Sequence, residues 1–353
     1  MNYPYVNSCR QRGAALVMAL LIMSLVVILA TSAESDHLIT YKRASNRLFM
    51  DQTRLYLLGA EDLGRRLLIE DKKLGMQQGA KPADYLGEIW AQDAAPYPVD
   101  GGWVGGKLED LQGRFNLNLL ANKVQTSTPG AQPQIPTDLN AIQNIFARLL
   151  RTFPEVPLSE QDAVAITAAV VDWMDNDDIV FLSGAESMDY ESANPPYMAA
   201  NQPFVSTSEL RMIKGFPPAL YDYLAPHVVA LPVNNLPIKI NINTATPNLL
   251  RALGSNGGNP TDPVDARVIE PLLQQRMLAT LEVNQVTQLL NVDSLVQPLL
   301  DTQSEYFLLK ASAQIGDVET TLYSILQRPM QVTGGQPNSP IPVDVLLRSS
   351  VPL

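Results

Sequence analysis

An uncharged run of twenty residues, Ala14 to Ala33, follows a short basic segment at the beginning of the chain. A helix of this length rises about 1.5 Å per residue and spans about 30 Å, which matches the hydrocarbon core of a bilayer. The preceding segment, residues 1–13, contains Arg10 and Arg12 and no acid, so the positive-inside rule places it in the cytoplasm. The sequence therefore predicts one transmembrane helix at residues 14–33, with the rest of the chain on the opposite side of the membrane.

Three interpretations of this N-terminus compete. In a secretory signal peptide, cleavage would follow the apolar run, at the small residues Ala30 to Ala33. In a plain single-pass anchor, the run would stay in the membrane without cleavage. In a prepilin-type leader, cleavage would fall before the run, after Gly13, and Ala14 would become the first residue of the mature chain.

The residues after the apolar run favour the prepilin-type leader. No proline occurs between Ala14 and Lys81, and apolar residues recur at helical spacing beyond the membrane segment. The simplest prediction is one helix from Ala14 to about Lys73, which is the shape of a pilin stem. A signal peptide would not need this continuation. Pilin-like proteins usually carry a glutamate at the fifth mature position, and here that position is Met18.

The segments after the stem indicate an α+β architecture with a large insertion. Residues 80–118 have strand and turn character, and two β-rich runs within residues 304–328 are joined by Gly316 and Asp317, which is a hairpin signal. The residues between these strand regions have helical patterns. The predicted units are a leader at 1–13, a transmembrane helix at 14–33, a stem and first strands at 34–118, an inserted α-domain at 119–303, C-terminal strands at 304–328 and a flexible tail at 329–353.

One acidic segment suggests a cation site. Residues 152–210 contain eleven Asp or Glu side chains and no Lys or Arg, and their centre is the run Asp172 to Asp178. Alternating oxygen ligands in a loop after a helix suit calcium, and the absence of histidine disfavours zinc, copper and iron. The alternatives are a solvated acidic loop and a two-metal hydrolase site, although no neighbouring base would serve a hydrolase.

Composition argues against an enzyme and against a nucleic-acid-binding role for the whole chain. One cysteine and two histidines exclude a disulfide framework, a cysteine-rich zinc site and most histidine-dependent catalysis. The formal net charge is −11, whereas phosphate binding requires a basic surface. We therefore expect no enzymatic activity and no nucleic-acid partner.

Five motifs occur in an order and at a spacing that resemble one family. They are Gly113-Arg114-Phe115-Asn116-Leu117-Asn118, Asp172-Trp173-Met174-Asp175-Asn176-Asp177, Gly184-Ala185-Glu186 with Tyr190, Ser208-Glu209-Leu210-Arg211, and Ile240-Asn241-Ile242-Asn243-Thr244-Ala245. Together with the leader, this set is similar to the type II secretion system protein K family (GspK), the large minor pseudopilins. The resemblance extends from the leader to the hairpin near Arg328.

The resemblance implies a fold, a position and partners. Members have a pilin-like fold with an inserted α-domain that contains SAM-like helical parts, and they lack the glutamate at mature position five. They cap the tip of the pseudopilus together with the minor pseudopilins I and J, alongside other pseudopilins, and so support protein export from the periplasm. The resemblance also implies cleavage by prepilin peptidase between Gly13 and Ala14, methylation of the new N-terminus, and an inner-membrane anchor with the C-terminal part in the periplasm.

The resemblance further implies calcium sites in the α-domain. The matching residues are Asp175, Asp177, Glu186 and Asn201. The family often has an acid directly after Gly-Ala-Glu, and this chain has Ser187 there, with Asp189 two residues further on as an additional candidate ligand.

Two alternatives remain open. The run from Ile240 to Leu250 also opens helix-hairpin-helix modules that bind DNA through backbone amides, although the stretch after it, Gly254 to Pro260, is long and irregular and the domain is acidic. A minor pilin of a type IV pilus or DNA-uptake system would share the leader but not the motifs after residue 113.

Overall fold

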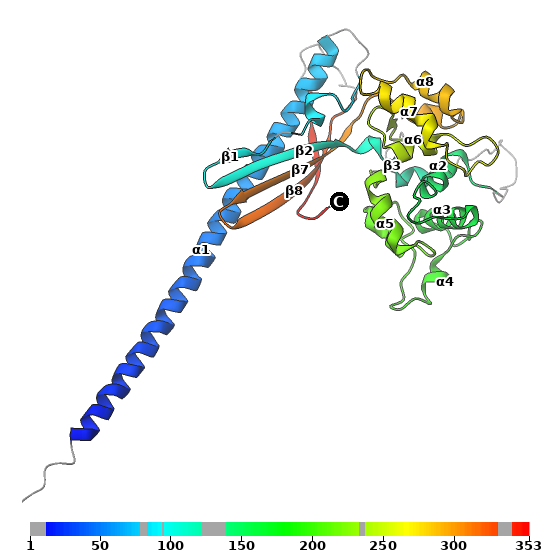
Figure 1. Ribbon diagram of the computed structural model, residues 1–353. Coiled ribbons are helices and arrows are strands. Elements are labelled where there is room, and N and C mark those ends of the chain that lie inside the picture. The colour runs from blue at the N-terminus through cyan, green and yellow to red at the C-terminus, as the bar shows by residue number, and fades with distance from the viewer. Residues whose placement is uncertain are drawn as a thin grey trace, which may run out of the picture.

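The computed structural model describes residues 12–77, 83–93, 95–121, 138–232, 237–330 and 341–352. Its longest element is the stem helix α1, Arg12–Gln77, with 66 residues. Figure 1 shows the N-terminal half of α1 running away from the molecule and the C-terminal half lying against a sheet. The prediction of one uninterrupted helix is confirmed, and residues 1–11 of the predicted leader lie outside the described residues.

The first half of α1 is the only part of the described chain that is long and apolar enough to cross a membrane. None of its apolar window is buried in the folded chain, and Leu21 and Ile28 are 63% and 62% exposed. A helix that is apolar on all sides and has no protein cover is stable in lipid. This half of α1 is therefore consistent with a single-pass anchor.

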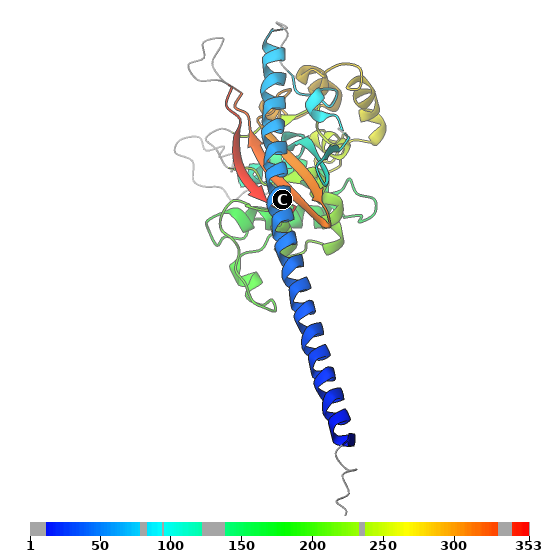
Figure 2. The same cartoon turned by 90° about the vertical axis from the view of Figure 1, so that its left-hand side faces the viewer.

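The sheet has five antiparallel strands in the order β1-β2-β7-β8-β9. Their bounds are β1 Tyr97–Val99, β2 Gly102–Asp110, β7 Tyr306–Ile315, β8 Val318–Gln327 and β9 Asp344–Ser349. Leu57 and Leu68 of α1 pack against Phe307, Leu309 and Leu326 of the sheet. Figure 2 shows the helix lying across one face of the strands. The buried stripe of α1 therefore fixes the stem to the sheet.

The predicted hairpin between β7 and β8 is confirmed, and its turn contacts the stem. Gly316 has a φ of 56°, which favours glycine. A side chain at this position would also place its Cβ 2.9 Å from the Phe49 ring of α1. The turn thus requires glycine for its backbone conformation and for its approach to the helix.

The predicted flexible tail is wrong for its last part. Asp344–Ser349 forms the edge strand β9, which pairs with β8. Arg348 donates to the buried carboxylate of Glu61 in α1 with two bonds, of 2.9 Å and 2.8 Å, and Val343 is buried before the strand. The proline-rich composition of the tail did not indicate this strand, because the strand is held in part by Glu61, 287 residues before Arg348 in the sequence. Residues 331–340 of the tail lie outside the described residues.

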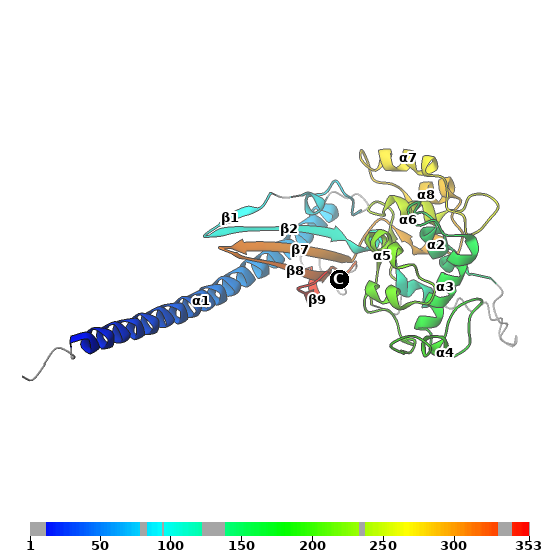
Figure 3. The same ribbon diagram turned by 60° about the horizontal axis from the view of Figure 1, so that its bottom comes forward.

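The inserted domain lies beyond the end of the strands (Figure 3). Its helices are α2 Ala141–Leu150, α3 Glu160–Met174, α4 Ser187–Tyr190, α5 Pro218–Leu224, α6 Pro247–Leu253, α7 Ala266–Gln275 and α8 Val283–Leu290. Two short parallel pairs accompany them, β3 Phe115–Asn116 with β4 Val228–Val229 and β5 Ile240–Asn241 with β6 Leu300–Asp301. The insertion is therefore mainly helical, with two minimal strand pairs that the prediction of an all-α domain did not include.

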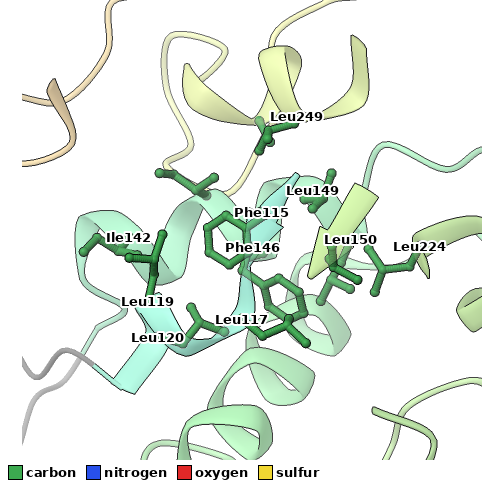
Figure 4. Packing of buried hydrophobic residues seen from close by; sticks show 14 of the residues in the cluster. Phe115, Leu117, Leu119, Leu120, Ile142, Phe146, Leu149, Leu150, Leu224 and Leu249 are labelled. Atoms are coloured by element: carbon green, nitrogen blue, oxygen red, sulfur yellow. The ribbon is translucent and has the colours of Figure 1, made fainter. Parts of the chain in front are cut away.

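Two phenylalanines form the centre of the inserted domain's core. Phe115 and Phe146 are fully buried, with ring centroids 5.7 Å apart. Figure 4 shows them surrounded by leucines from α2, α5 and α6. Because β2 ends at Asp110 and both Phe115 and Leu117 belong to this core, the domain begins before the boundary predicted between residues 118 and 119.

The asparagines of the first sequence motif hold the chain where it enters the inserted domain. The Asn118 amide donates to the carbonyls of Phe204, at 3.0 Å, and Leu231, at 2.7 Å, and its oxygen accepts from the Phe204 N–H at 2.7 Å. Asn116 accepts from the Leu231 N–H at 3.1 Å. The two asparagine side chains therefore form the hydrogen bonds that buried backbone groups would otherwise form within a helix or a sheet.

The last sequence motif joins the inserted domain to the sheet. The Asn241 amide donates to the Asp84 carbonyl at 3.0 Å, the Asp110 carboxylate at 3.0 Å and the Ser304 hydroxyl at 2.9 Å. Thr244 also donates to Asp110, at 2.5 Å. Asp110 and Ser304 lie where the chain leaves and re-enters the sheet, so this motif positions the two parts relative to each other.

Candidate functional site

An acidic loop between α3 and α4 brings together three of the predicted cation ligands. Asp175 follows the last residue of α3, Asp177 lies two residues further on, and Glu186 directly precedes α4. Each residue has one carboxylate oxygen within 4.8 Å of the other two. The structure thus gathers Asp175, Asp177 and Glu186 into one carboxylate cluster.

Two buried side chains at this loop have oxygen atoms without a hydrogen-bond partner. Glu186 is 3% exposed, and neither of its carboxylate oxygens is paired within the described structure. The Asn201 side-chain oxygen is also buried without a partner. Asn201 has a left-handed backbone with φ of 48°, and its N–H donates to the Trp173 carbonyl at 2.9 Å. Asn201 is therefore held next to the beginning of the loop.

The loop takes its shape from Asp172, the first residue of its motif. The Asp172 side chain is fully buried and accepts from the Phe181 N–H at 3.1 Å. Gly184 lies against the same carboxylate, and a side chain at Gly184 would collide with the Asp172 oxygen. Trp173 packs edge-to-face on Tyr190, with ring centroids 5.3 Å apart. The aspartate and the aromatic pair thus bring the two ends of the loop together.

The carboxylates of the loop repel one another. Burial, together with the negative charges of Asp175, Asp177, Asp178 and Asp189, raises the pKa of Glu186 to about 7. Burial also raises the pKa of Asp172 to about 7, and the charges of Glu186 and Asp175 add to the effect. Full ionisation of this loop at neutral pH is therefore unfavourable without a compensating cation.

Asp189, the fifth predicted ligand, has a different role. One oxygen accepts from the Glu186 N–H at 3.1 Å, and the other accepts from the Lys214 ammonium at 2.6 Å. These bonds lower the pKa of Asp189. Asp189 thus caps α4 and pairs with a lysine, and the structure does not place it in the carboxylate cluster.

The arrangement suits a hard divalent cation. Three carboxylates and one amide supply only oxygen donors, which is the ligand set of calcium. The unpaired oxygens of Glu186 and Asn201 are the observation that distinguishes this loop from a solvated acidic surface. The cluster could therefore hold a hard divalent metal ion.

A second carboxylate cluster was missed by sequence reasoning. Asp71 of α1 and Asp84 and Glu88 of the following segment also have oxygens within 4.8 Å of one another. Arg328 lies among them, 2% exposed, and forms ion pairs with Asp71 and Asp84. Because a guanidinium pairs with two of its three carboxylates, this group is an ion-pair cluster. No local sequence pattern indicates it, since Arg328 is separated from Asp71 by 257 residues.

The part of α1 that follows the membrane segment is a candidate surface for binding a partner protein. Leu55 and Leu63 are 69% and 58% exposed, and Leu58 is 37% exposed, although they lie beside the sheet-packed stripe. Gly13 and Ala14, the predicted processing site, are exposed at the beginning of the helix. The stem thus presents unpaired apolar side chains along its length outside the membrane.

Comparison with known proteins identifies the family. Residues 113–233 match the family model for type II secretion system (T2SS), protein K. Type II secretion system protein K of Aeromonas hydrophila is 33% identical over 91% of this chain and 94% of its own length. The corresponding protein of Pseudomonas aeruginosa is 32% identical over 90% of this chain and 89% of its own length.

A solved structure supports the same assignment. The chain matches one in the crystal structure of the GspK-GspI-GspJ complex from the enterotoxigenic Escherichia coli type 2 secretion system, with a TM-score of 0.66 and 27% identity. The match covers 88% of this chain and all of the solved chain. With its stem helix, antiparallel sheet and inserted helical domain, the chain belongs to the type II secretion system protein K family, the large minor pseudopilins.

Proposed function

We propose that this pseudopilin occupies the tip of the type II secretion pseudopilus as a single copy, bound to the two smaller minor pseudopilins I and J. The complex in which the similar Escherichia coli chain was solved contains GspI and GspJ, which supports this set of partners. The observation that carries the position is the inserted domain, which lies at the end of the stem far from the N-terminus (Figure 1). A domain of this bulk obstructs a further subunit stacked above it.

Met18 supports the same position. A glutamate at mature position five would pair with the N-terminal amine of a neighbouring subunit inside the membrane, and an unpaired carboxylate in lipid is costly. Met18 is apolar and 64% exposed on α1, so this chain does not require that pair. A terminal subunit has neighbours on one side only, which is consistent with losing one inter-subunit charge pair.

We also propose that the N-terminal leader is removed and that the inserted domain binds calcium. Prepilin peptidase cleaves after Gly13, the new N-terminus at Ala14 is methylated, and the protein stays anchored in the inner membrane with its folded part in the periplasm. Calcium binds Asp175, Asp177, Glu186 and Asn201 and stabilises the inserted domain, which is supported by the unpaired buried oxygens of the loop. The protein is a structural subunit and not an enzyme.

The helix-hairpin-helix alternative receives no support from the hairpin after α6. Arg148 is buried and donates to the carbonyls of Ala252, at 2.5 Å, and Pro260, at 2.6 Å, and Arg151 pairs with Asp262. The basic groups nearest this hairpin therefore bind the protein's own backbone and an acid, and they are not presented to a phosphate.

The tip position is tested by labelling isolated pseudopili with gold-conjugated antibody against the inserted domain. We expect label at one end of each filament, because the domain blocks addition above it. The control is antibody against the major pseudopilin, which should mark the whole shaft. Label from the first antibody along the shaft would refute the tip position while leaving the family assignment intact.

The partner surface is tested by truncating exposed leucines of the stem. We expect Leu55→Ala with Leu63→Ala to reduce co-purification of both smaller pseudopilins at least tenfold, since burying one leucine contributes about 1.5–3 kcal/mol. Both side chains are exposed in the isolated chain, so its melting temperature should change little. The matched control is Leu346→Ala, which is 44% exposed on β9. Unchanged recovery of both partners with the double variant would exclude this face of α1.

A further inference from the structure

The end of the stem helix is attached to the sheet by an unusual group of carboxyls. Asp71 belongs to α1, Asp84 and Glu88 to the segment that follows it, and Arg328 directly follows β8. One Arg328 nitrogen donates to Asp71 at 2.8 Å, the other donates to Asp84, and the guanidinium lies over the Phe307 ring at 4.8 Å. One guanidinium thus pairs with two carboxylates through its terminal nitrogens, and its single positive charge faces three carboxyls.

Glu88 has no basic partner in this cluster. Its Oε2 accepts from the Trp90 indole N–H at 2.6 Å and from the Tyr85 N–H at 3.1 Å. One carboxyl oxygen of Glu88 lies within 4.8 Å of oxygens of both Asp71 and Asp84. Carboxylates this close repel one another, so ionisation of all three is unfavourable. A proton held between Glu88 and Asp71 would relieve this repulsion.

The other charged groups around the cluster do not replace this proton. The Lys72 ammonium donates to the carbonyls of Pro329 and Met330, both at 2.9 Å. Glu305, which faces Lys72, accepts from the Met330 N–H at 2.9 Å. The Asp84 side chain accepts from the Ser304 N–H at 2.7 Å, and the more distant Asp110 lies behind Ser304. The Lys72 ammonium thus binds backbone carbonyls and not the carboxyl of Glu88.

We propose that Glu88 and Asp71 share one proton at neutral pH. This proton stabilises the packing of the end of the stem helix against the segment 83–93 and the end of β8. When the proton leaves, two carboxylates face each other across a contact that previously attracted them. The same cluster is connected to the inserted domain, because Asp84 accepts hydrogen bonds from Ser304 and Asn241. Protonation of the Glu88 and Asp71 pair therefore affects the place where the stem, the sheet and the inserted domain meet.

The electrostatics agree with the geometry. Burial, followed by the charge of Asp71, raises the pKa of Glu88 to about 8, and burial raises the pKa of Asp71 as well. In the unfolded chain Glu88 titrates near 4.5, so the folded protein holds one more proton between these two pH values. Stability from this group is therefore complete below about pH 4.5, decreases as pH rises and is lost above about pH 8.

The test compares Glu88→Gln with wild type in the detergent-solubilised full chain. Glutamine keeps the size of the side chain and supplies a permanent donor to Asp71. We expect the melting temperature of Glu88→Gln minus that of wild type to be smallest near pH 4.5, to increase as pH rises, and to reach several degrees at pH 9. Other groups, such as Asp110 and the acidic loop, titrate in both proteins. Their contribution to the melting temperature therefore cancels when one value is subtracted from the other. The matched control is Glu70→Gln, an exposed partner of Lys73 on the same helix end, which should show no such trend.

Infrared difference spectroscopy provides a second readout. Between pH 7 and pH 9 the wild type should lose one more protonated carboxyl than Glu88→Gln, because the carboxyls of the acidic loop titrate in both proteins. A melting difference that is the same at all pH values would overturn the proposal. So would an equal loss of protonated-carboxyl signal from the wild type and from Glu88→Gln in this range.

Discussion

Calcium added to chelator-treated protein is expected to raise its melting temperature, and to raise it more at pH 8 than at pH 6. A ligand that binds only the folded state stabilises it by about 2.7 kcal/mol at a hundredfold excess over Kd. The pH dependence follows from Glu186, whose pKa is raised to about 7 in the absence of a cation. At pH 6 calcium competes with a bound proton, whereas at pH 8 the carboxylate is already ionised.

Without calcium the same residue should act in the opposite direction. A folded pKa above the unfolded value means that the contribution of Glu186 to stability is complete below about pH 4.5 and is lost as pH rises through about 7. The melting temperature of the calcium-free protein should therefore fall over this range, and calcium should remove the decline. Thermal unfolding followed by circular dichroism, with chelator and with calcium at each pH, measures both trends.

Two variants separate a cation site from a solvated acidic loop. Asp175→Ala with Asp177→Ala should abolish the calcium-dependent rise, because two of the four oxygen donors are lost. The matched control is Asp178→Asn, which removes a charge from an exposed side chain of the same loop and should retain most of the rise. If chelator leaves the melting curve of the wild type unchanged at pH 8, the loop does not hold calcium at the concentrations used.

Replacement of Gly13 by leucine is expected to abolish maturation. Cleavage after Gly13 should leave Ala14 as the N-terminus, and glycine allows the peptidase to approach the backbone closely. Outside its own turn of α1, no described atom lies within 4 Å of a Cβ built at Gly13, so the substitution should not disturb the fold. Accumulation of the uncleaved form would then report processing alone. Mass spectrometry and N-terminal sequencing of the membrane fraction provide the measurement.

The stem offers a matched control for this experiment. Gly59 also lies on α1, and outside its own helix turn no described atom lies within 4 Å of a Cβ built there, so Gly59→Leu makes the same change far from the cleavage site. Its maturation should equal that of the wild type. A mature N-terminus after Ala33 in the wild type would indicate an ordinary signal peptide and would contradict the pilin-type stem.

The sequence determined the features that depend on local pattern. Helical spacing and the absence of proline from Ala14 to Lys81 specified α1, and Gly316-Asp317 between β-rich runs specified the β7–β8 hairpin. The density of acids between residues 152 and 210 located the candidate calcium loop. Periodicity, turn chemistry and charge density are properties of neighbouring residues, so they are visible without a fold.

Tertiary structure alone decided which of these acids converge and which do not. Asp189 is only three residues from Glu186, yet Lys214 and the α4 N-terminus occupy its oxygens, and Asn201 reaches the loop through its backbone bond to Trp173. The tail likewise became a strand because β8 and Glu61 offer it partners. The cluster of Asp71, Asp84 and Glu88 likewise takes its arginine, Arg328, from a distant part of the chain. Charge pairing and burial act through space, and sequence separation carries no information about which distant groups will share one buried site.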